Sequence, residues 1–193
     1  MFTEKFDKEK YNITEKFMTA KKVNLLSLLI LLPLYIIEVV IYISQRSYAN
    51  IFATVFKATF ILEIFIMLIG VFVVIMAAML AKTALLAVFS EGKMNSVKFK
   101  IIRETQKPYC CLTEPIKVWQ YQICLAVYIL VAGVAPYVAA LVSGDFLLVI
   151  GSFICAFFAG GDILFFITLF GIKSDAYVLD FEGLMLYRVY EEI

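Results

Sequence analysis

The sequence contains no histidine among its 193 residues. A zinc peptidase site built on a helix needs the pattern H-E-x-x-H, in which two imidazoles bind the metal and the glutamate activates a water molecule. The absence of histidine therefore excludes a site of this kind. The chain also has no large excess of positive or negative charge. It contains 17 Lys and Arg residues and 16 Asp and Glu residues, which gives a net charge of +1. This balance gives no basis for nucleic-acid binding.

Cysteine is scarce, and its spacing carries no metal-binding pattern. The four cysteines are Cys110, Cys111, Cys124 and Cys155. The adjacent pair is neither C-x-x-C nor a known zinc spacing, so we interpret all four as small apolar residues or reduced cytosolic thiols. A secretory signal peptide is also lacking, because the first apolar run follows a charged stretch and no small-residue cleavage site comes after it. We therefore expect the first membrane helix to be retained.

Long hydrophobic runs are abundant. The chain is 63% hydrophobic, with a mean hydropathy of +0.94, whereas soluble domains are about 45–50% apolar. About 20 helical residues cross the hydrocarbon core of a bilayer, and unpaired backbone cannot face lipid. The runs predict transmembrane helices over residues 23–44, 55–89, 121–142 and 146–172. The predicted fold class is an all-α membrane protein, with residues 23–193 forming a single four-helix transmembrane domain.

The polar N-terminal segment, residues 1–22, mixes charged and apolar side chains. Its apolar residues Phe2, Phe6, Ile13 and Phe17 are spaced by 4, 7 and 4 positions, which places them on one helical face. This pattern predicts an amphipathic helix lying on the cytoplasmic membrane surface. A partly ordered tail is the alternative.

Two further polar segments are the loop 90–120 and the tail 173–193. Polar and apolar residues alternate over residues 97–103, which predicts a short strand. The tail has β-like stretches at residues 177–179 and 184–187. We expect these stretches to form a small cytoplasmic β element.

The distribution of basic residues predicts the orientation in the membrane. Six lysines lie within residues 1–22 and six bases within the loop 90–120, whereas the other two loops contain only Arg46. Because loops rich in Lys and Arg stay in the cytoplasm, we expect both termini and the middle loop to be cytoplasmic.

Three runs in the second half of the chain follow one another in a characteristic order and spacing. They are residues 109–121 (YCCLTEPIKVWQY), 159–163 (AGGDI) and 178–183 (VLDFEG). Together they resemble the bacterial zincin peptidase family, a membrane family of unknown function. The resemblance extends from about Ile64 to the C-terminus and implies a location in a bacterial cell membrane.

The resemblance implies that an H-E-x-x-H motif would stand before the cytoplasmic loop. It aligns best with residues 82–86 (KTALL), or with a register one residue earlier, and either register puts leucine at the second histidine. The aspartate of the second run, Asp162, would be a candidate third ligand, and Phe181 replaces a histidine in the third run. We therefore expect a degenerate site of Lys82 and Asp162, with no catalytic residue, no metal and no cofactor.

A charge inside a bilayer costs about 2.5–3.5 kcal/mol and needs a partner or a water-filled cavity. Helix rise places Lys82 near the cytoplasmic interface and Asp162 in the inner leaflet, where helix tilt could bring them level. Either the Lys82 ammonium replaces the metal and neutralises Asp162, or it reaches the headgroups while Asp162 bonds to helix neighbours.

Two membrane-embedded acids, Glu38 and Glu63, are predicted in the outer half of the bilayer. They could share a proton, or one could pair with Lys57. Such a pair would be either a cavity for a cation or protonated carboxyls bonded between helices.

Three functions are compatible with these features. The first is a non-catalytic binding or accessory protein that holds a membrane protein partner or a second copy in the bilayer, for instance by strand addition to the β element. The second is a small transporter or transporter subunit that uses Glu38 and Glu63. The third is an active intramembrane metallopeptidase with Asp162 and Asp180, Glu114 or Glu182 around a hard cation.

Overall fold

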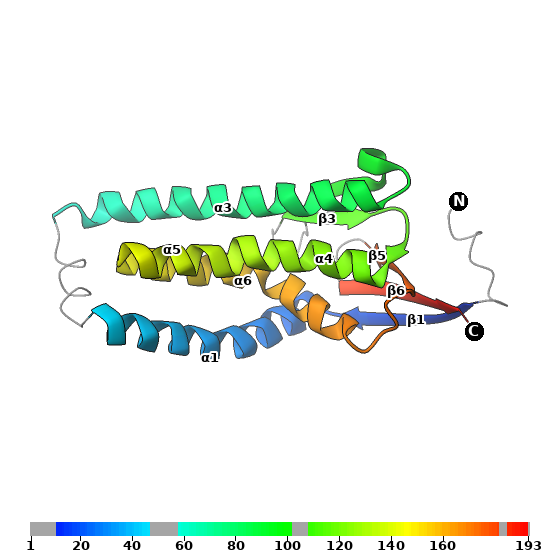
Figure 1. The fold of residues 1–193 in the computed structure, drawn as a ribbon, viewed down its shortest axis with the longest axis horizontal. Coiled ribbons are helices and arrows are strands. Elements are labelled where there is room, and N and C mark those ends of the chain that lie inside the picture. The colour runs from blue at the N-terminus through cyan, green and yellow to red at the C-terminus, as the bar shows by residue number, and fades with distance from the viewer. Residues whose placement is uncertain (1–10, 47–57, 102–107, 182–184, 193) are drawn as a thin grey trace.

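The computed structural model describes residues 11–46, 58–101, 108–181 and 185–192. Four helical segments are long and apolar enough to cross a membrane: Lys21–Arg46, Phe60–Phe89, Val118–Ser143 and Phe146–Leu169. They stand side by side along the long axis of the molecule, and strands gather at one end of the bundle (Figure 1). The prediction of four long apolar helices is therefore confirmed, to within a few residues at most boundaries.

The first, second and fourth segments are single helices. They are α1 (Ala20–Arg46), α3 (Phe60–Phe89) and α6 (Phe146–Leu169). Large apolar side chains such as Leu29, Phe72 and Val88 are exposed on their outer faces, as expected for surfaces that meet lipid rather than water.

The third segment is continuous but changes its winding. It begins as α4 (Val118–Ile129), widens into a π-helical turn at Leu130–Val134, and continues as α5 (Ala135–Ser143). Pro136 lies just after the wide turn. A proline inside a helix lacks an N–H and clashes with the carbonyl four residues earlier, so the π-helical turn provides the room that Pro136 requires.

The strands form two antiparallel groups. The larger sheet has the order β1-β6-β5-β4 and the smaller pairs β2 with β3. Their bounds are β1 Tyr11–Met18, β2 Val97–Ile101, β3 Pro108–Leu112, β4 Ile116–Lys117, β5 Tyr177–Phe181 and β6 Met185–Glu192. A short 3₁₀ turn, Lys93–Ser96, links α3 to β2. The expected β element is present and is larger than predicted.

The prediction of an N-terminal amphipathic helix is wrong for its described part. Residues 11–18 form strand β1, which pairs with β6 from Tyr11 opposite Glu192 to Met18 opposite Met185. Residues 1–10 lie outside the described part of the chain. Tyr11 and Ile13 are half-buried and Asn12 and Thr14 are exposed, so the same apolar residues also fit the two-residue period of a strand. The partner strand lies more than 160 residues away in the sequence, which no local pattern reveals.

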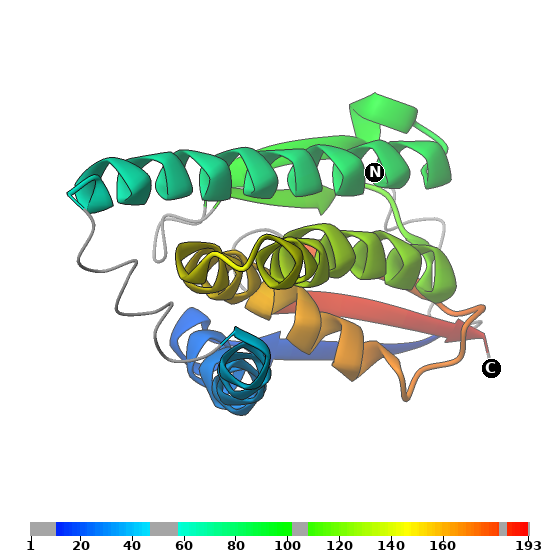
Figure 2. The ribbon, with the colours of Figure 1, turned by 60° about the vertical axis from the view of Figure 1, so that its left-hand side comes forward.

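The pairing of β1 with β6 places the two ends of the described chain together at the sheet end of the bundle (Figure 2). The main buried cluster also lies there, where α3, α4 and α6 meet the strands. Its members include Leu86, Cys110, Tyr121, Leu125, Phe165, Leu169, Val178 and Tyr187. The best-packed part of the protein is therefore the junction between the helices and the sheet.

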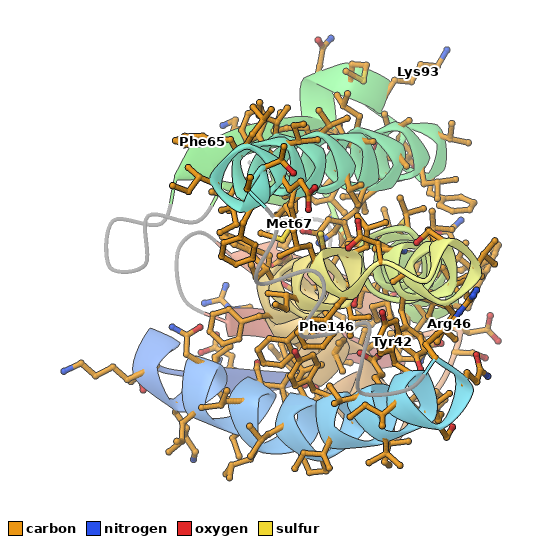
Figure 3. All side chains as sticks on the ribbon, turned by 90° about the vertical axis from the view of Figure 1, so that its left-hand side faces the viewer. Tyr42, Arg46, Phe65, Met67, Lys93 and Phe146 are labelled. Atoms are coloured by element: carbon orange, nitrogen blue, oxygen red, sulfur yellow. The ribbon has the colours of Figure 1, made fainter. Side chains whose placement is uncertain are left out.

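At the opposite end, hydrogen bonds connect α1 to the turn between α5 and α6. The buried hydroxyl of Tyr42 donates to the carbonyl of Gly144 at 2.8 Å, and Arg46 donates to the carbonyl of Val142 at 3.2 Å. Gly144 has φ +72°, which L side chains adopt at a cost. Figure 3 shows Tyr42, Arg46 and Phe146 gathered between α1 and this turn.

Helices α1 and α6 pack closely at Gly160, so we expect a single methyl group added there to lower the stability of the protein. A Cβ atom at Gly160 would lie 2.6 Å from the Cβ of Ser27, whereas one at Gly70 would meet nothing within 4 Å. Gly160→Ala should therefore push the two helices apart and destabilise the protein by about 1–3 kcal/mol. Gly70→Ala is the control and should be neutral or slightly stabilising. Thermal unfolding in detergent measures both, and equal melting temperatures would contradict the packing.

Candidate functional site

Lys82 and Asp162 form an ion pair inside the helix bundle. The Nζ atom of Lys82 on α3 lies 2.5 Å from Oδ1 of Asp162 on α6. The side chain of Lys82 is 4% exposed and that of Asp162 is 17% exposed. Of the two interpretations of Lys82, the structure forms the ion pair with Asp162.

Helix geometry explains why the two charges meet. Lys82 stands seven residues before Phe89, the last residue of α3, and Asp162 stands seven residues before Leu169, the last residue of α6. Each is therefore about 10 Å from the sheet end of its helix. Because α3 and α6 pack against each other, the two side chains lie at the same level without any need for unequal tilt.

The ammonium of Lys82 has further partners. Its Nζ lies 5.6 Å from the centre of the Tyr128 ring on α4, within the range of a cation–π interaction. Asp180 and Cys110 also lie close enough to interact with it electrostatically. Elements α3, α4, α6, β3 and β5 thus all contribute to one buried polar cluster around Lys82.

Asp180 connects this cluster to the sheet. It lies on β5, is 2% exposed, and accepts a hydrogen bond of 2.6 Å from the hydroxyl of Tyr121 on α4. Tyr187 stands opposite Asp180 on β6. The ring of Phe165 on α6 packs between those of Tyr121 and Tyr187, at 4.9 and 4.6 Å between ring centres. A buried carboxylate and three rings in mutual contact therefore hold the sheet against the helices.

Cys110 interacts electrostatically with both charges of the ion pair. Its Sγ lies 3.5 Å from the hydroxyl of Thr83, which donates to the carbonyl of Met79 at 2.7 Å. Burial raises the pKa of the Cys110 thiol, and this effect exceeds the lowering by Thr83 and the Lys82 ammonium. The thiol is therefore neutral at physiological pH, which disfavours a role as a nucleophile.

The carboxylates that could have completed a metal site are not assembled. Glu114 accepts a hydrogen bond from the backbone N–H of Gly92 at 2.9 Å and so closes the loop after α3. Glu182 lies outside the described residues. Within the part of the chain that the structure describes, no three Cys, Asp or Glu side chains form a group that could hold a metal ion. With an ammonium at Asp162 and leucine at position 86, the residues present do not fit zinc.

Glu38 and Glu63 do not meet. Helices α1 and α3 lie on opposite sides of the layer formed by α4, α5 and α6 (Figures 1 and 3). Glu63 accepts a hydrogen bond from Thr59 at 2.8 Å, and Tyr137 donates to the backbone carbonyl of Glu38 at 3.3 Å. Because α3 begins at Phe60, Glu63 stands in its first turn and not deep in the span. Lys57 lies outside the described residues.

The sequence pattern identifies Lys82 and Asp162 but misses most of their surroundings. It suggests Asp180 only as a metal ligand, and it does not indicate Tyr121, Tyr128 or Thr83 as partners. Asp180 does stand in one of the three runs that carry the resemblance, and Cys110 and Tyr121 stand in another. The presence of these polar residues in the runs is the sequence signal that could have identified them as members of the cluster.

The comparisons with known proteins return no similarity. No protein-family model matches the chain, and no curated protein or solved structure matches it either. The resemblance to the zincin peptidases therefore rests on the three sequence runs alone.

A double-mutant cycle tests the coupling of Lys82 and Asp162. Breaking one side of a buried pair typically costs about 3–5 kcal/mol, because the other charge is left in a medium of low dielectric. Lys82→Met should therefore lower the melting temperature clearly, and Lys82→Met combined with Asp162→Asn should recover much of the loss. Lys173→Met, at an exposed lysine, is the control and should change stability by less than about 0.5 kcal/mol. Additive effects of the two substitutions would show that the groups do not interact.

Proposed function

We propose that this protein is an integral membrane protein that acts by binding a partner and not by catalysis. The observation that carries the proposal is the ion pair itself. The carboxylate of Asp162 is neutralised by the ammonium of Lys82 at 2.5 Å, so it has no charge left to offer a metal ion. The side chains of Tyr128, Cys110 and Asp180 surround the ammonium.

Descent from a zinc peptidase is part of the proposal, and two features support it. Residues from all three runs, namely Cys110, Tyr121, Asp162 and Asp180, belong to the cluster around Lys82. Moreover, Lys82, Thr83 and Leu86 are all buried, whereas Ala81 and Leu85 are only partly buried. The register that starts at Lys82 would thus direct an H-E-x-x-H motif toward Asp162, since residues four apart share a helix face.

The proposed orientation places the sheet in the cytoplasm of a bacterial cell. Exposed Lys21, Lys22, Lys93, Lys98 and Lys173 lie at the sheet end. Arg46 is the one base described at the other end. This asymmetry follows the rule that basic residues stay inside.

Strand β1 is the proposed binding surface. It is eight residues long and stands at one edge of the four-stranded sheet, paired on one side with β6. No other described strand pairs with β1, so along its second edge an extended peptide could add as a further strand. A membrane protein partner with an extended cytoplasmic segment would fit this edge. A transporter that uses Glu38 and Glu63 together loses its structural basis, because the two acids lie on different sides of the bundle.

Restoring the missing motif tests the proposed ancestry. Lys82→His, Thr83→Glu and Leu86→His in one chain would place two imidazoles and Asp162 around one point. We expect this triple variant to bind about one zinc ion per chain, measured by elemental analysis after dialysis. The matched control carries Lys82→His and Thr83→Glu but keeps Leu86, and it should bind little. Equal zinc contents of the two variants would argue against a former metal site.

Proline substitutions in β1 test the binding surface. Successive residues of a strand direct their N–H groups to opposite edges, so one of Ile13 and Thr14 faces β6 and the other faces outward. Proline at the inward position should lower the melting temperature, whereas proline at the outward position should leave it unchanged and release the partner. The measurement is the amount of a stoichiometric partner that co-purifies after mild detergent extraction. A protein recovered alone, or a partner retained by both proline variants, would contradict strand addition.

A further inference from the structure

A groove opens on the surface of the bundle at the end remote from the sheet. It lies between α3 and the helices α5 and α6 and has a volume of about 330 Å³. Figure 3 looks onto this end and shows Met67 between α3 and the neighbouring helices. The groove belongs neither to the Lys82 cluster nor to the sheet, so a ligand bound in it would be independent of the function proposed for the edge of β1.

Small residues leave this space open. Gly70 on α3, Ala139 on α5 and Gly151 on α6 all line the groove. A Cβ atom added at Gly70 would meet nothing within 4 Å, whereas one at Gly151 would meet Cγ of Met67 at 3.2 Å. The groove is therefore open over Gly70, and the Met67 side chain packs against its floor at Gly151.

Among the described residues, the charged side chains that line the groove lie at one end. They are Glu63, in the first turn of α3, and Asp145, the N-cap of α6. None of the lining residues in the described part of the chain is basic. The hydroxyl of Ser152 is bound to the carbonyl of Val149 at 2.7 Å, so the rest of the groove offers an apolar surface.

The length of the groove matches one leaflet of a bilayer. Its lining extends from Glu63 to Val74 on α3 and from Asp145 to Cys155 on α6, which is about 15–17 Å at the helical rise per residue. One leaflet contributes half of a hydrocarbon core of about 30 Å, or about 15 Å. The groove thus reaches from the headgroup level to the middle of the membrane.

We propose that this groove binds one acyl chain of a phospholipid whose headgroup carries an amine. The apolar length accommodates the chain within the leaflet opposite the sheet. The carboxylates of Glu63 and Asp145 stand at headgroup depth, where they attract the ammonium group and disfavour an anionic headgroup. Arg46, the base described at this end of the bundle, donates to the carbonyl groups of Leu141 and Val142 and does not line the groove.

Lipid retention measured by native mass spectrometry tests the site. The protein is reconstituted in nanodiscs of phosphatidylethanolamine and phosphatidylglycerol in equal amounts and is then transferred to a mild detergent. The wild-type protein should keep about one phosphatidylethanolamine per chain. Glu63→Gln should still keep a lipid but lose its preference for the amine headgroup by about tenfold, since a charge-assisted hydrogen bond is lost.

Variants that fill the groove distinguish lipid bound in the groove from lipid bound elsewhere on the surface of the bundle. Gly70→Phe should reduce retention about tenfold, since its side chain enters open space, and Ala139→Phe fills the same groove from α5 if the first variant does not fold. Ala77→Phe is the matched control, because Ala77 is exposed on α3 and does not line the groove. Undiminished retention in both filling variants would overturn the proposal. So would a wild-type protein without a bound lipid, or an unchanged headgroup preference in Glu63→Gln.

Discussion

The structure depends on one electrostatic constraint, which is that the charge of Lys82 must be neutralised inside an apolar bundle. An ammonium removed from water is stable only beside an opposite charge and with its hydrogen bonds made. Asp162 supplies the charge and Tyr128 an aromatic face. These partners lie on α6 and α4. The contacts of Lys82 therefore fix the positions of α3, α4 and α6 relative to one another in the half of the bundle next to the sheet.

The same constraint extends to the sheet. Asp180 brings a second carboxylate from β5 into the cluster, and the hydroxyl of Tyr121 holds it there. Strand β5 pairs with β6, and β6 pairs with β1. The sheet thus connects the cluster to both ends of the described chain. The helical bundle and the small sheet are thus linked, because buried polar groups from both belong to one cluster.

Local sequence pattern predicts the spans and misses the contacts that depend on distant partners. The four apolar helices follow from uninterrupted apolar runs. The ion pair of Lys82 with Asp162 is one of two alternatives, because the depths expected from sequence differ and only helix tilt could bring the two residues level. Strand β1 is predicted wrongly as a helix, because Ile13 and Phe17 fit both periods and the deciding partner β6 lies at the other end of the chain. The pairing of Tyr121 with Asp180 escapes prediction for the same reason. Glu38 and Glu63 are expected together because sequence gives depth but not the side of the bundle on which a helix stands.

The most direct test of the account is the state of the Lys82 side chain in a lipid bilayer. Solid-state NMR of protein labelled with ¹⁵N at the lysine Nζ and ¹³C at the aspartate carboxyl groups measures the dipolar coupling between Lys82 and Asp162, with Lys82→Met to assign the signal. The account predicts an ammonium ¹⁵N shift and the strong coupling of two directly hydrogen-bonded groups. A neutral amine, or an ammonium coupled to lipid phosphate in place of Asp162, would contradict it.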